Sequence, residues 1–492
     1  MPDRPLELVV KNVRVVRPGQ PRVERLDLGV AGGRFVRLAP DIPAAEAAEV
    51  YDARGRLGFP GVVDAHTHVG IYGPLADDAV TESRAAVSGG VTTMLTYFRT
   101  GQYYLNRSGP YAEFFPEVLR LSDGRYHCDY GYHLAPITAA HVDEMEALAT
   151  RHGVPSFKIF MFYGGYGLHG QAGPDAQRRF LMIGPEEHYD LAHFEFVLRA
   201  AGRVQRAHPA RAEHVSVSLH CEVADILDAY TRLVARDPSL SGLRAYSAAR
   251  PPHAEGLAVW IAAYLASEAA CANVNLLHLS SRKAIDAALQ MQAVFPHVDF
   301  RREVTIGHLI LDVSSPSKEL AKVNPPIRPR EDVEYLWEKL LEGKIDWVVS
   351  DHACCRHETK VAKKYFGNIW MAKSGFGGTE YLLPALVSEG MKRGLSLNRI
   401  AALLSLNPAK RFGLNSKGDI AEGLDADLAL VDPRSTWTIR AKDSESTQGY
   451  TPFEGIELGA KVKATFLRGS LVCENGNIVG KPKGKYLKRP TA

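Results

Sequence analysis

The segment Phe59-Pro-Gly-Val-Val-Asp-Ala-His-Thr-His68 carries the strongest local signal for the fold. It is an apolar run that ends in two histidines separated by one residue. Because alternate side chains of a strand project from the same face, we expect His66 and His68 to point together at the end of this strand. Two imidazoles on one face form half of a metal site. An isolated pair of this kind is equally compatible with ordinary packing, so the rest of the chain must decide.

Four other apolar runs end in, or contain, side chains of the same kind. They are residues 215–219 before His220, residues 274–277 before His278, residues 345–350 before Asp351, and residues 156–162, which contain Lys158. In a (β/α)₈ barrel the catalytic groups lie at the carboxyl ends of the strands. A single histidine after a strand is usually structural. Four histidines, an aspartate and a strand-borne lysine in this layout predict a metal site at the mouth of a barrel.

The order of apolar runs and helical patterns along the chain supports this architecture. Between residues 59 and 413, short apolar runs alternate with longer helical patterns, which is the βα rhythm of a parallel sheet or barrel. Both ends of the chain read as short strands separated by turns. We therefore expect an α/β protein with three parts: a small β domain from residues 1–58 plus 415–480, a barrel over 59–414, and a basic C-terminal tail over 481–492.

The composition is that of an ordinary globular protein. The 492 residues include 59 basic and 56 acidic side chains, 46% of the chain is hydrophobic, and the formal net charge is +3. At about 150 residues per domain the length alone suggests three domains, but one barrel can absorb about 250 residues. The small net charge gives no reason to expect nucleic acid or a membrane surface as a partner.

Nothing in the sequence indicates secretion or membrane insertion. The longest nearly unbroken apolar stretch, residues 257–266, is too short to cross a bilayer, and the N-terminus lacks the apolar core of a secretory signal. Six cysteines without regular CxxC spacing do not suggest a disulfide framework. We expect a reduced, cytoplasmic protein.

Lys158 needs a chemical explanation if it belongs to a metal site. A lysine ammonium has no lone pair and cannot bind a metal. Carbamylation by CO₂ would convert the side chain into a carboxylate able to bridge two cations. The alternative is an unmodified lysine paired with Asp351 in the barrel mouth.

Several further motifs occur in order along nearly the whole chain. Beside the segment ending in His68, they are Phe157-Lys-Ile-Phe-Met-Phe-Tyr163, Asn324-Pro-Pro-Ile-Arg328, Ser350-Asp-His-Ala353, residues 375–380, Asn407-Pro-Ala-Lys410 and Gly423-Leu-Asp-Ala-Asp427. The set resembles the cyclic amidohydrolases, the dihydropyrimidinase/hydantoinase, allantoinase and dihydroorotase branch of the amidohydrolase superfamily. The resemblance implies a (β/α)₈ TIM-like barrel with a small β-sandwich domain built from both termini. It also implies a binuclear hydrolase that opens the amide bond of a cyclic ureide or imide.

The same resemblance implies roles for individual residues. The ligands of two divalent metals, usually zinc, would be His66, His68 and Asp351 for one ion and His220 and His278 for the other. Carbamylated Lys158 would bridge the ions together with a hydroxide, which attacks the amide. Asp351 would act as general base and then as general acid. Tyr163 would donate to the developing oxyanion, with a buried structural tyrosine as the alternative.

Substrate discrimination rests on departures from the family pattern. Dihydroorotases usually carry an arginine two residues after the histidine pair, where this chain has Gly70, and losing that cation argues against an anionic pyrimidine. Hydantoinases usually place serine before the Pro-Pro pair and asparagine before the glycine of a later loop. This chain has Asn324 and Ser374 instead, an apparent exchange of hydrogen-bonding types. Together with Tyr163, the residues expected to contact the substrate are Asn324, Ser374 and Gly375.

These features rank the functions. A hydantoinase or dihydropyrimidinase comes first, and an allantoinase- or dihydroorotase-like cyclic amidohydrolase second. A non-catalytic scaffold homologue is the competing class, disfavoured because all six ligand positions are filled. One-metal deaminases of the superfamily typically lack the bridging lysine. The resemblance further implies a homo-oligomer, either a tetramer or a dimer, acting on a small cyclic amide.

Two positions near the expected site have a less defined role. The glycine-rich segment 164–173 follows a strand directly, and we interpret it as a loop over the site. Arg99 follows the run Leu95-Thr-Tyr-Phe98, and we expect it to form a surface salt bridge, with contact to an acidic substituent as the alternative.

Overall fold

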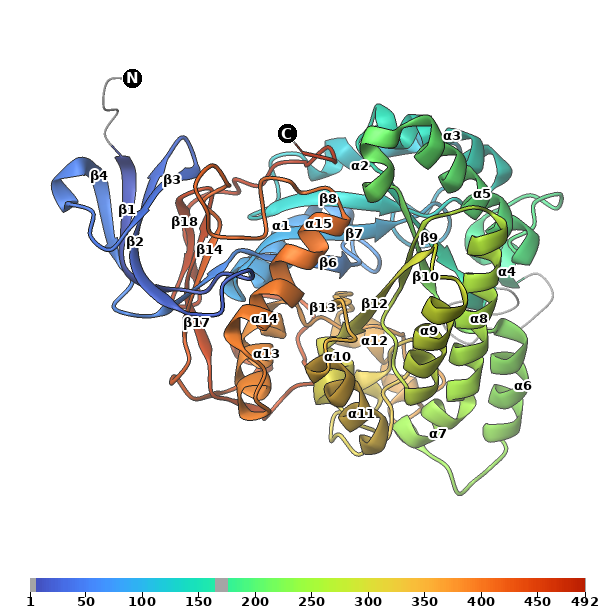
Figure 1. The fold of residues 1–492 in the computed structure, drawn as a ribbon. Coiled ribbons are helices and arrows are strands. Elements are labelled where there is room, and N and C mark those ends of the chain that lie inside the picture. Colours follow the sequence, from blue (N-terminus) through green and yellow to red (C-terminus); the bar gives the residue numbers. More distant parts are fainter. Residues whose placement is uncertain (1–5, 164–175, 492) are drawn as a thin grey trace.

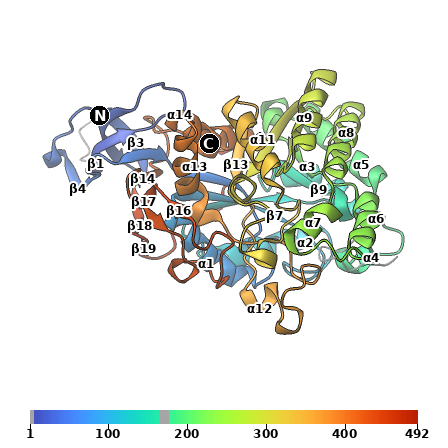
Figure 2. The same cartoon turned by 90° about the horizontal axis from the view of Figure 1, so that it is seen from below.

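The computed structural model describes residues 6–163 and 176–491, which form a barrel and a separate mixed sheet (Figure 1). The interpreted loop at residues 164–173 lies outside the described residues. The predicted fold class is confirmed, because the central strands are parallel and are separated by helices that lie outside the barrel (Figures 1 and 2).

The barrel consists of eight strands whose order in the sheet follows their order in the chain. Their bounds are β6 (Val62–Thr67), β7 (Val91–Phe98), β8 (Asp129–Leu134), β9 (Ser156–Phe160), β10 (Ser216–His220), β11 (Asn273–Leu276), β12 (Asp299–Thr305) and β13 (Trp347–Val349). Every neighbouring pair is parallel. Strands covered on both faces are typical of such sheets, and every residue of these strands is buried except Asp299, Arg301 and Arg302 of β12.

Contacts between the first and last strands close the barrel. The backbone N–H of His68 donates to the carbonyl of His352 at 2.7 Å, and Thr67 pairs in parallel with His352. Beneath this contact the backbone N–H and hydroxyl of Ser350 both donate to the Asp64 carboxylate. The ends of β6 and β13, which carry His66 and precede Asp351, are thereby brought side by side.

The helices that connect or follow these strands vary in length. Their bounds are α1 (Leu75–Ser88), α2 (Tyr111–Ser122), α3 (Ala139–Thr150), α4 (Ala176–Leu181), α5 (Leu191–Ala207), α6 (Ala224–Val234), α7 (Gly242–Ala249), α8 (Pro252–Glu268), α9 (Arg282–Val294), α10 (Ile306–Ile310), α11 (Arg330–Leu341), α12 (His357–Lys360), α13 (Leu382–Lys392), α14 (Leu397–Ala401) and α15 (Asn407–Arg411). None of the helices within the described residues is long and apolar enough to cross a membrane.

The mixed sheet has nine strands drawn from both ends of the chain. They are β1 (Leu6–Val15), β2 (Glu24–Ala31), β3 (Arg34–Ala39), β4 (Ala47–Asp52), β5 (Leu57–Pro60), β14 (Leu428–Asp432), β17 (Lys461–Leu467), β18 (Ser470–Glu474) and β19 (Asn477–Ile478). A separate pair joins β15 (Trp437–Thr438) to β16 (Glu457–Leu458). Val13 and Leu28 from the N-terminal strands pack in one core with Leu428 and Phe466 from the C-terminal strands. The exact division of the chain into domains stays a prediction.

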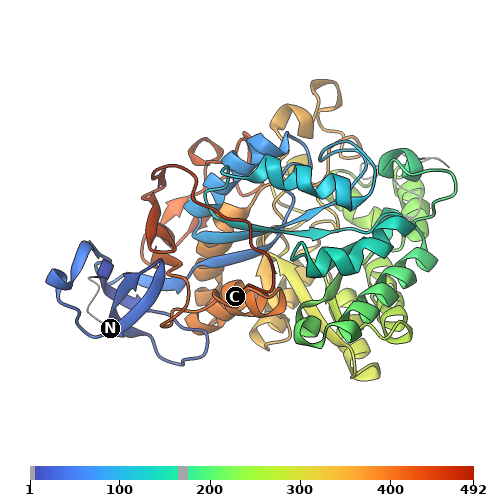
Figure 3. The ribbon, with the colours of Figure 1, turned by 90° about the horizontal axis from the view of Figure 1, so that it is seen from above.

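The C-terminal segment leaves the mixed sheet and runs onto the barrel (Figure 3). Tyr486 pairs in parallel with Tyr130 of β8, and the buried Arg489 guanidinium donates to the carbonyl of Tyr132. These contacts anchor the tail to β8 of its own barrel.

Candidate active site

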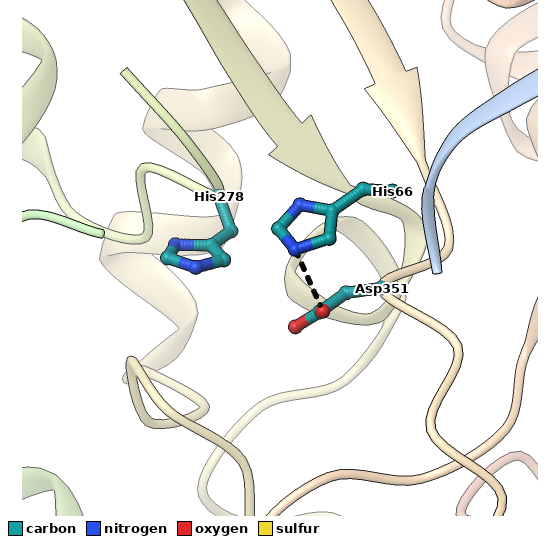
Figure 4. Close-up of side chains that lie close together, drawn as sticks. All are labelled: His66, His278 and Asp351. Atoms are coloured by element: carbon teal, nitrogen blue, oxygen red, sulfur yellow. Dashed lines mark ion pairs between the residues drawn. The ribbon is translucent and has the colours of Figure 1, made fainter. Parts of the chain in front are cut away.

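His66 and His68 converge on one carboxylate at the mouth of the barrel. The Nε2 atoms of both imidazoles lie 3.2 Å from Oδ1 of Asp351. His66 leaves the end of β6 and Asp351 follows β13, so closure of the barrel produces this meeting (Figure 4). His66 and His68 therefore face the same way, as the alternation of side chains along a strand predicts.

Lys158 reaches the same place from β9. Its Nζ lies 3.0 Å from Nε2 of His66 and 4.2 Å from the centre of the Tyr97 ring. Burial lowers the pKa of Lys158, although the nearby charges of Asp351 and Glu303 act to raise it. None of the described carboxylates forms an ion pair with its ammonium group. The alternative of a direct ion pair between Lys158 and Asp351 is thus not what the structure contains.

His220 and His278 complete the cluster from the next two strands. His220 ends β10 and His278 lies two residues after β11, and their ring centres are 4.3 Å apart. The His278 ring also lies 5.3 Å from that of His66. Nδ1 of His278 is buried without a hydrogen-bond partner among the described residues. A buried nitrogen of this kind is costly unless a ligand occupies it.

The donor set fits a divalent metal. Ligand atoms of His66, His278 and Asp351 lie within 4.8 Å of one another, all in buried side chains. Imidazole nitrogen and carboxylate oxygen are the ligands typical of catalytic zinc sites. His278 and Asp351 also adopt φ values of 33° and 54°, in the left-handed region that residues other than glycine rarely occupy. Backbone strain of this kind is concentrated at functional sites.

Glu303 supports the cluster from below. Its Oε1 lies 2.7 Å from Nδ1 of His66 and accepts the backbone N–H of His278 at 3.1 Å. Sequence reasoning missed this residue. The available signal was a charged residue two positions before Thr305, which ends β12. Side chains two residues apart in a strand point to the same side, so Glu303 faces the same way as Thr305.

Two further supports were also missed. Oε2 of Glu222 lies 2.7 Å from Nε2 of His220, and the Arg250 guanidinium binds the same carboxylate. The hydroxyl of Tyr104 lies 2.8 Å from Nδ1 of His68. Partners of this type fix the tautomer and ring orientation of metal-binding histidines.

A pocket opens above the cluster, and all the predicted substrate contacts line it. They are Tyr163, Asn324, Ser374 and Gly375. The Asn324 Nδ2 and Ser374 Oγ atoms are buried without hydrogen-bond partners among the described residues. The hydroxyl of Tyr246 donates to Oδ1 of Asn324 at 2.5 Å, which leaves the amide nitrogen as the free group. Both free atoms are therefore available to a ligand.

Arg99 corrects one expectation from the sequence. Its side chain is only 1% exposed, so the prediction of a surface salt bridge is wrong. The guanidinium lies 4.4 Å from the centre of the Phe180 ring and 5.6 Å from that of Tyr163. The last residues of β7 enter the barrel mouth rather than the surface, which turns Arg99 inward between aromatic rings.

Comparison with known proteins agrees with this geometry. Residues 253–472 match the Amidohydrolase family. The chain is 34% identical over 486 residues to the allantoinase of Rubrobacter xylanophilus, covering 98% of this chain and 97% of that protein. It is also 30% identical over 489 residues to an allantoinase of Escherichia coli, covering 98% of each. The chain belongs to the amidohydrolase family.

Solved structures extend the likeness to the whole fold. The dihydropyrimidinase of Brevibacillus agri superposes with a TM-score of 0.82 at 26% identity, over 98% of both chains. The D-hydantoinase of a Bacillus species gives 0.81 at 27% identity, over 99% of both. This family member is a cyclic amidohydrolase of the hydantoinase and allantoinase group, a hydrolase of cyclic amide carbon–nitrogen bonds.

Proposed function

We propose that this amidohydrolase opens the hydantoin ring of allantoin, a hydantoin that carries a ureido group. The observation that carries the proposal is the 34% identity to an allantoinase along 98% of the chain. The sequence alone ranked hydantoinase first and allantoinase second, and the curated relatives favour the second. Hydantoinase or dihydropyrimidinase activity stays as the second candidate, supported by the likeness to those structures.

Two divalent metal ions, with zinc favoured by the donor set, are part of this proposal. His66, His68 and Asp351 would hold one ion, and His220 and His278 the other. Lys158 would bridge them as a carbamate, which requires the uncharged amine that burial favours. The buried free nitrogen of His278 and the convergence of the ligand atoms support this assignment. When bound, such ions lower the pKa of water and polarise the amide carbonyl.

Asp351 is proposed to move the proton. Burial raises the pKa of its carboxyl, but the adjacent His66, His68 and Lys158 outweigh burial and hold the pKa well below its usual range. The ionised carboxylate accepts a proton from the attacking water as the new carbon–oxygen bond forms. It then delivers that proton to the ring nitrogen as the carbon–nitrogen bond breaks. The product is a ring-opened ureido acid.

Tyr163 and the loop residues are proposed to hold the substrate. The Tyr163 hydroxyl would donate to the oxygen on which negative charge develops during attack. Asn324 and Ser374 offer free polar atoms to the polar groups of the ureide. Gly375 has a φ of 94°, and a Cβ there would lie 2.9 Å from the Ala353 side chain. A larger residue at Gly375 would therefore strain the backbone and press against Ala353, which lines the same pocket.

The test is a comparison of kcat/KM for ring opening by zinc-loaded protein. The panel holds allantoin, hydantoin, 5-phenylhydantoin, dihydrouracil and dihydroorotate. The proposal predicts the highest kcat/KM for allantoin. A preference for hydantoins or dihydrouracil would establish the second candidate instead, and absence of turnover across the panel would refute both.

A further inference from the structure

Tyr104 occupies an unusual place in the pocket wall. It lies beyond the end of β7, lines the same pocket as Tyr163, and has its hydroxyl 2.8 Å from Nδ1 of His68. Its backbone φ is 52° and that of Tyr103 is 66°, both in the left-handed region. Bulky residues rarely adopt this conformation, which here places the phenol against His68.

The direction of the hydrogen bond follows from the other nitrogen of His68. Nε2 faces Oδ1 of Asp351 at 3.2 Å and is the nitrogen directed at the proposed metal. A metal-binding nitrogen must offer a lone pair, so the proton of the neutral imidazole lies on Nδ1. Nδ1–H then donates to the oxygen of Tyr104. The phenol keeps its own proton for a different acceptor.

The described side chains that pack against the Tyr104 ring do not accept that proton. The Phe98 ring centre lies 4.5 Å from that of Tyr104, and the Arg99 guanidinium lies 5.5 Å from the Tyr104 ring. Neither side chain can accept a hydrogen bond. Among the described residues, the only hydrogen bond of this hydroxyl is the one with His68. Within residues 6–163 and 176–491, the acceptor for this proton is therefore left to the open pocket.

We propose that the Tyr104 hydroxyl has two roles, and this inference rests on the proposed function. The hydroxyl orients His68, and it donates a hydrogen bond to a substrate carbonyl oxygen that does not belong to the cleaved amide. The Tyr104 hydroxyl binds Nδ1 of His68, the nitrogen that faces away from Asp351. The hydroxyl is therefore offset from the reacting carbonyl by the width of an imidazole. In allantoin the group that suits this position is the ureido carbonyl. Tyr104 is thus a substrate-specificity residue as well as a positioning residue for His68.

The experiment compares Tyr104→Phe with Tyr111→Phe. Phenylalanine keeps the ring contact with Phe98 and removes only the hydroxyl. Tyr111 is the matched control, because its buried hydroxyl donates to the carbonyl of Ala135 at 2.7 Å, away from the metal ligands. Zinc affinity is measured by competition with a chromophoric chelator, and KM is measured for allantoin and for unsubstituted hydantoin.

Tyr104→Phe is expected to weaken zinc binding about 10-fold, since the partner of a metal-binding histidine is lost. It should also raise KM for allantoin about 3- to 10-fold more than KM for hydantoin, the effect of one neutral hydrogen bond. Tyr111→Phe should change neither quantity. Unchanged zinc affinity, or equal effects on the two substrates, would overturn the inference. Failure of the unmodified protein to bind zinc or open either ring would instead refute the proposed function, and the inference with it.

Discussion

Oε1 of Glu303 lies 2.7 Å from Nδ1 of His66 and also accepts the backbone N–H of His278. Its second oxygen accepts the indole N–H of Trp347 at 2.9 Å. One buried carboxylate thus positions two of the histidines proposed to bind metal. Because a buried carboxylate is costly unless it is hydrogen-bonded, this arrangement favours a role in holding the site rather than incidental packing.

Glu303→Gln should therefore weaken metal binding. A glutamine oxygen facing His66 and His278 places the amide nitrogen against the indole N–H of Trp347, where two donors meet. The side chain cannot satisfy all three donors, which weakens its hold on the His66 imidazole. We expect a 10- to 100-fold loss, roughly, in zinc affinity, measured by chelator competition. Asp129→Asn is the control, since it changes a buried carboxylate that accepts from Lys417 and from Arg468, which lies between β17 and β18 of the mixed sheet. Equal losses in the two variants would show that the effect is general destabilisation.

Lys158→Ala should remove bound metal and activity together. The alanine variant has no group that can carry a carbamate between the two proposed ions. Metal content by elemental analysis should fall, and native mass spectrometry of the unmodified protein in bicarbonate should show the added mass of one CO₂. Two ions retained at full occupancy in Lys158→Ala would contradict the bridging role.

Tyr163→Phe separates binding from chemistry. Loss of an oxyanion donor typically lowers kcat about 10²- to 10³-fold. KM should change little, because the contact strengthens only as charge develops on the oxygen. Steady-state kinetics with allantoin provide the measurement. A rise in KM at unchanged kcat would assign Tyr163 to substrate binding alone.

The barrel and the six proposed ligands could be predicted because each depends on a local pattern. A strand fixes which side its residues face, and the residue after its end lies at the barrel mouth. His66 and Asp351 could therefore be paired in advance, although 285 positions separate them.

The supporting residues could not be predicted in this way. Glu303 acts through contacts with β6, β13 and the segment after β11, and no local pattern specifies that meeting. Tyr104 depends on a left-handed loop conformation that its sequence does not indicate. The burial of Arg99 likewise follows from how α4 covers the end of β7, as its contact with Phe180 shows.

A buried ion pair next to the site predicts how stability depends on pH. Nε2 of His352 lies 2.9 Å from Oε2 of Glu82. Burial opposes ionisation of both groups, but their interaction prevails: it raises the pKa of His352 and lowers that of Glu82 to about 2. The stabilisation that His352 contributes is complete below the pKa it has in the unfolded chain, and it is lost as pH rises through the raised pKa of the folded state. The stabilisation that Glu82 contributes is present above the pKa it has in the unfolded chain, and it is lost as pH falls towards 2.

Glu82→Gln should accordingly lower the free energy of unfolding most at mildly acidic pH. Breaking a buried pair costs about 3–5 kcal/mol when the partner stays charged. The difference in unfolding free energy between the two proteins should shrink above the raised pKa of His352, where that side chain is neutral. Denaturant unfolding at about pH 5.5 and about pH 9 checks this. A pH-independent difference would mean that the hydrogen bonds of Glu82 to Ser446 and Thr447, rather than its charge, dominate.

The proposed ring opening is tested by an NMR time course of allantoin with zinc-loaded protein, run beside the Asp351→Asn variant. We expect loss of the ring signals, stoichiometric appearance of a single ring-opened ureido acid, and at least a 100-fold slower conversion by the variant, roughly the scale of a general acid–base contribution. Conversion at an undiminished rate by Asp351→Asn, or unchanged allantoin in the presence of the metal-loaded protein, would contradict the proposed ring opening and the role of Asp351.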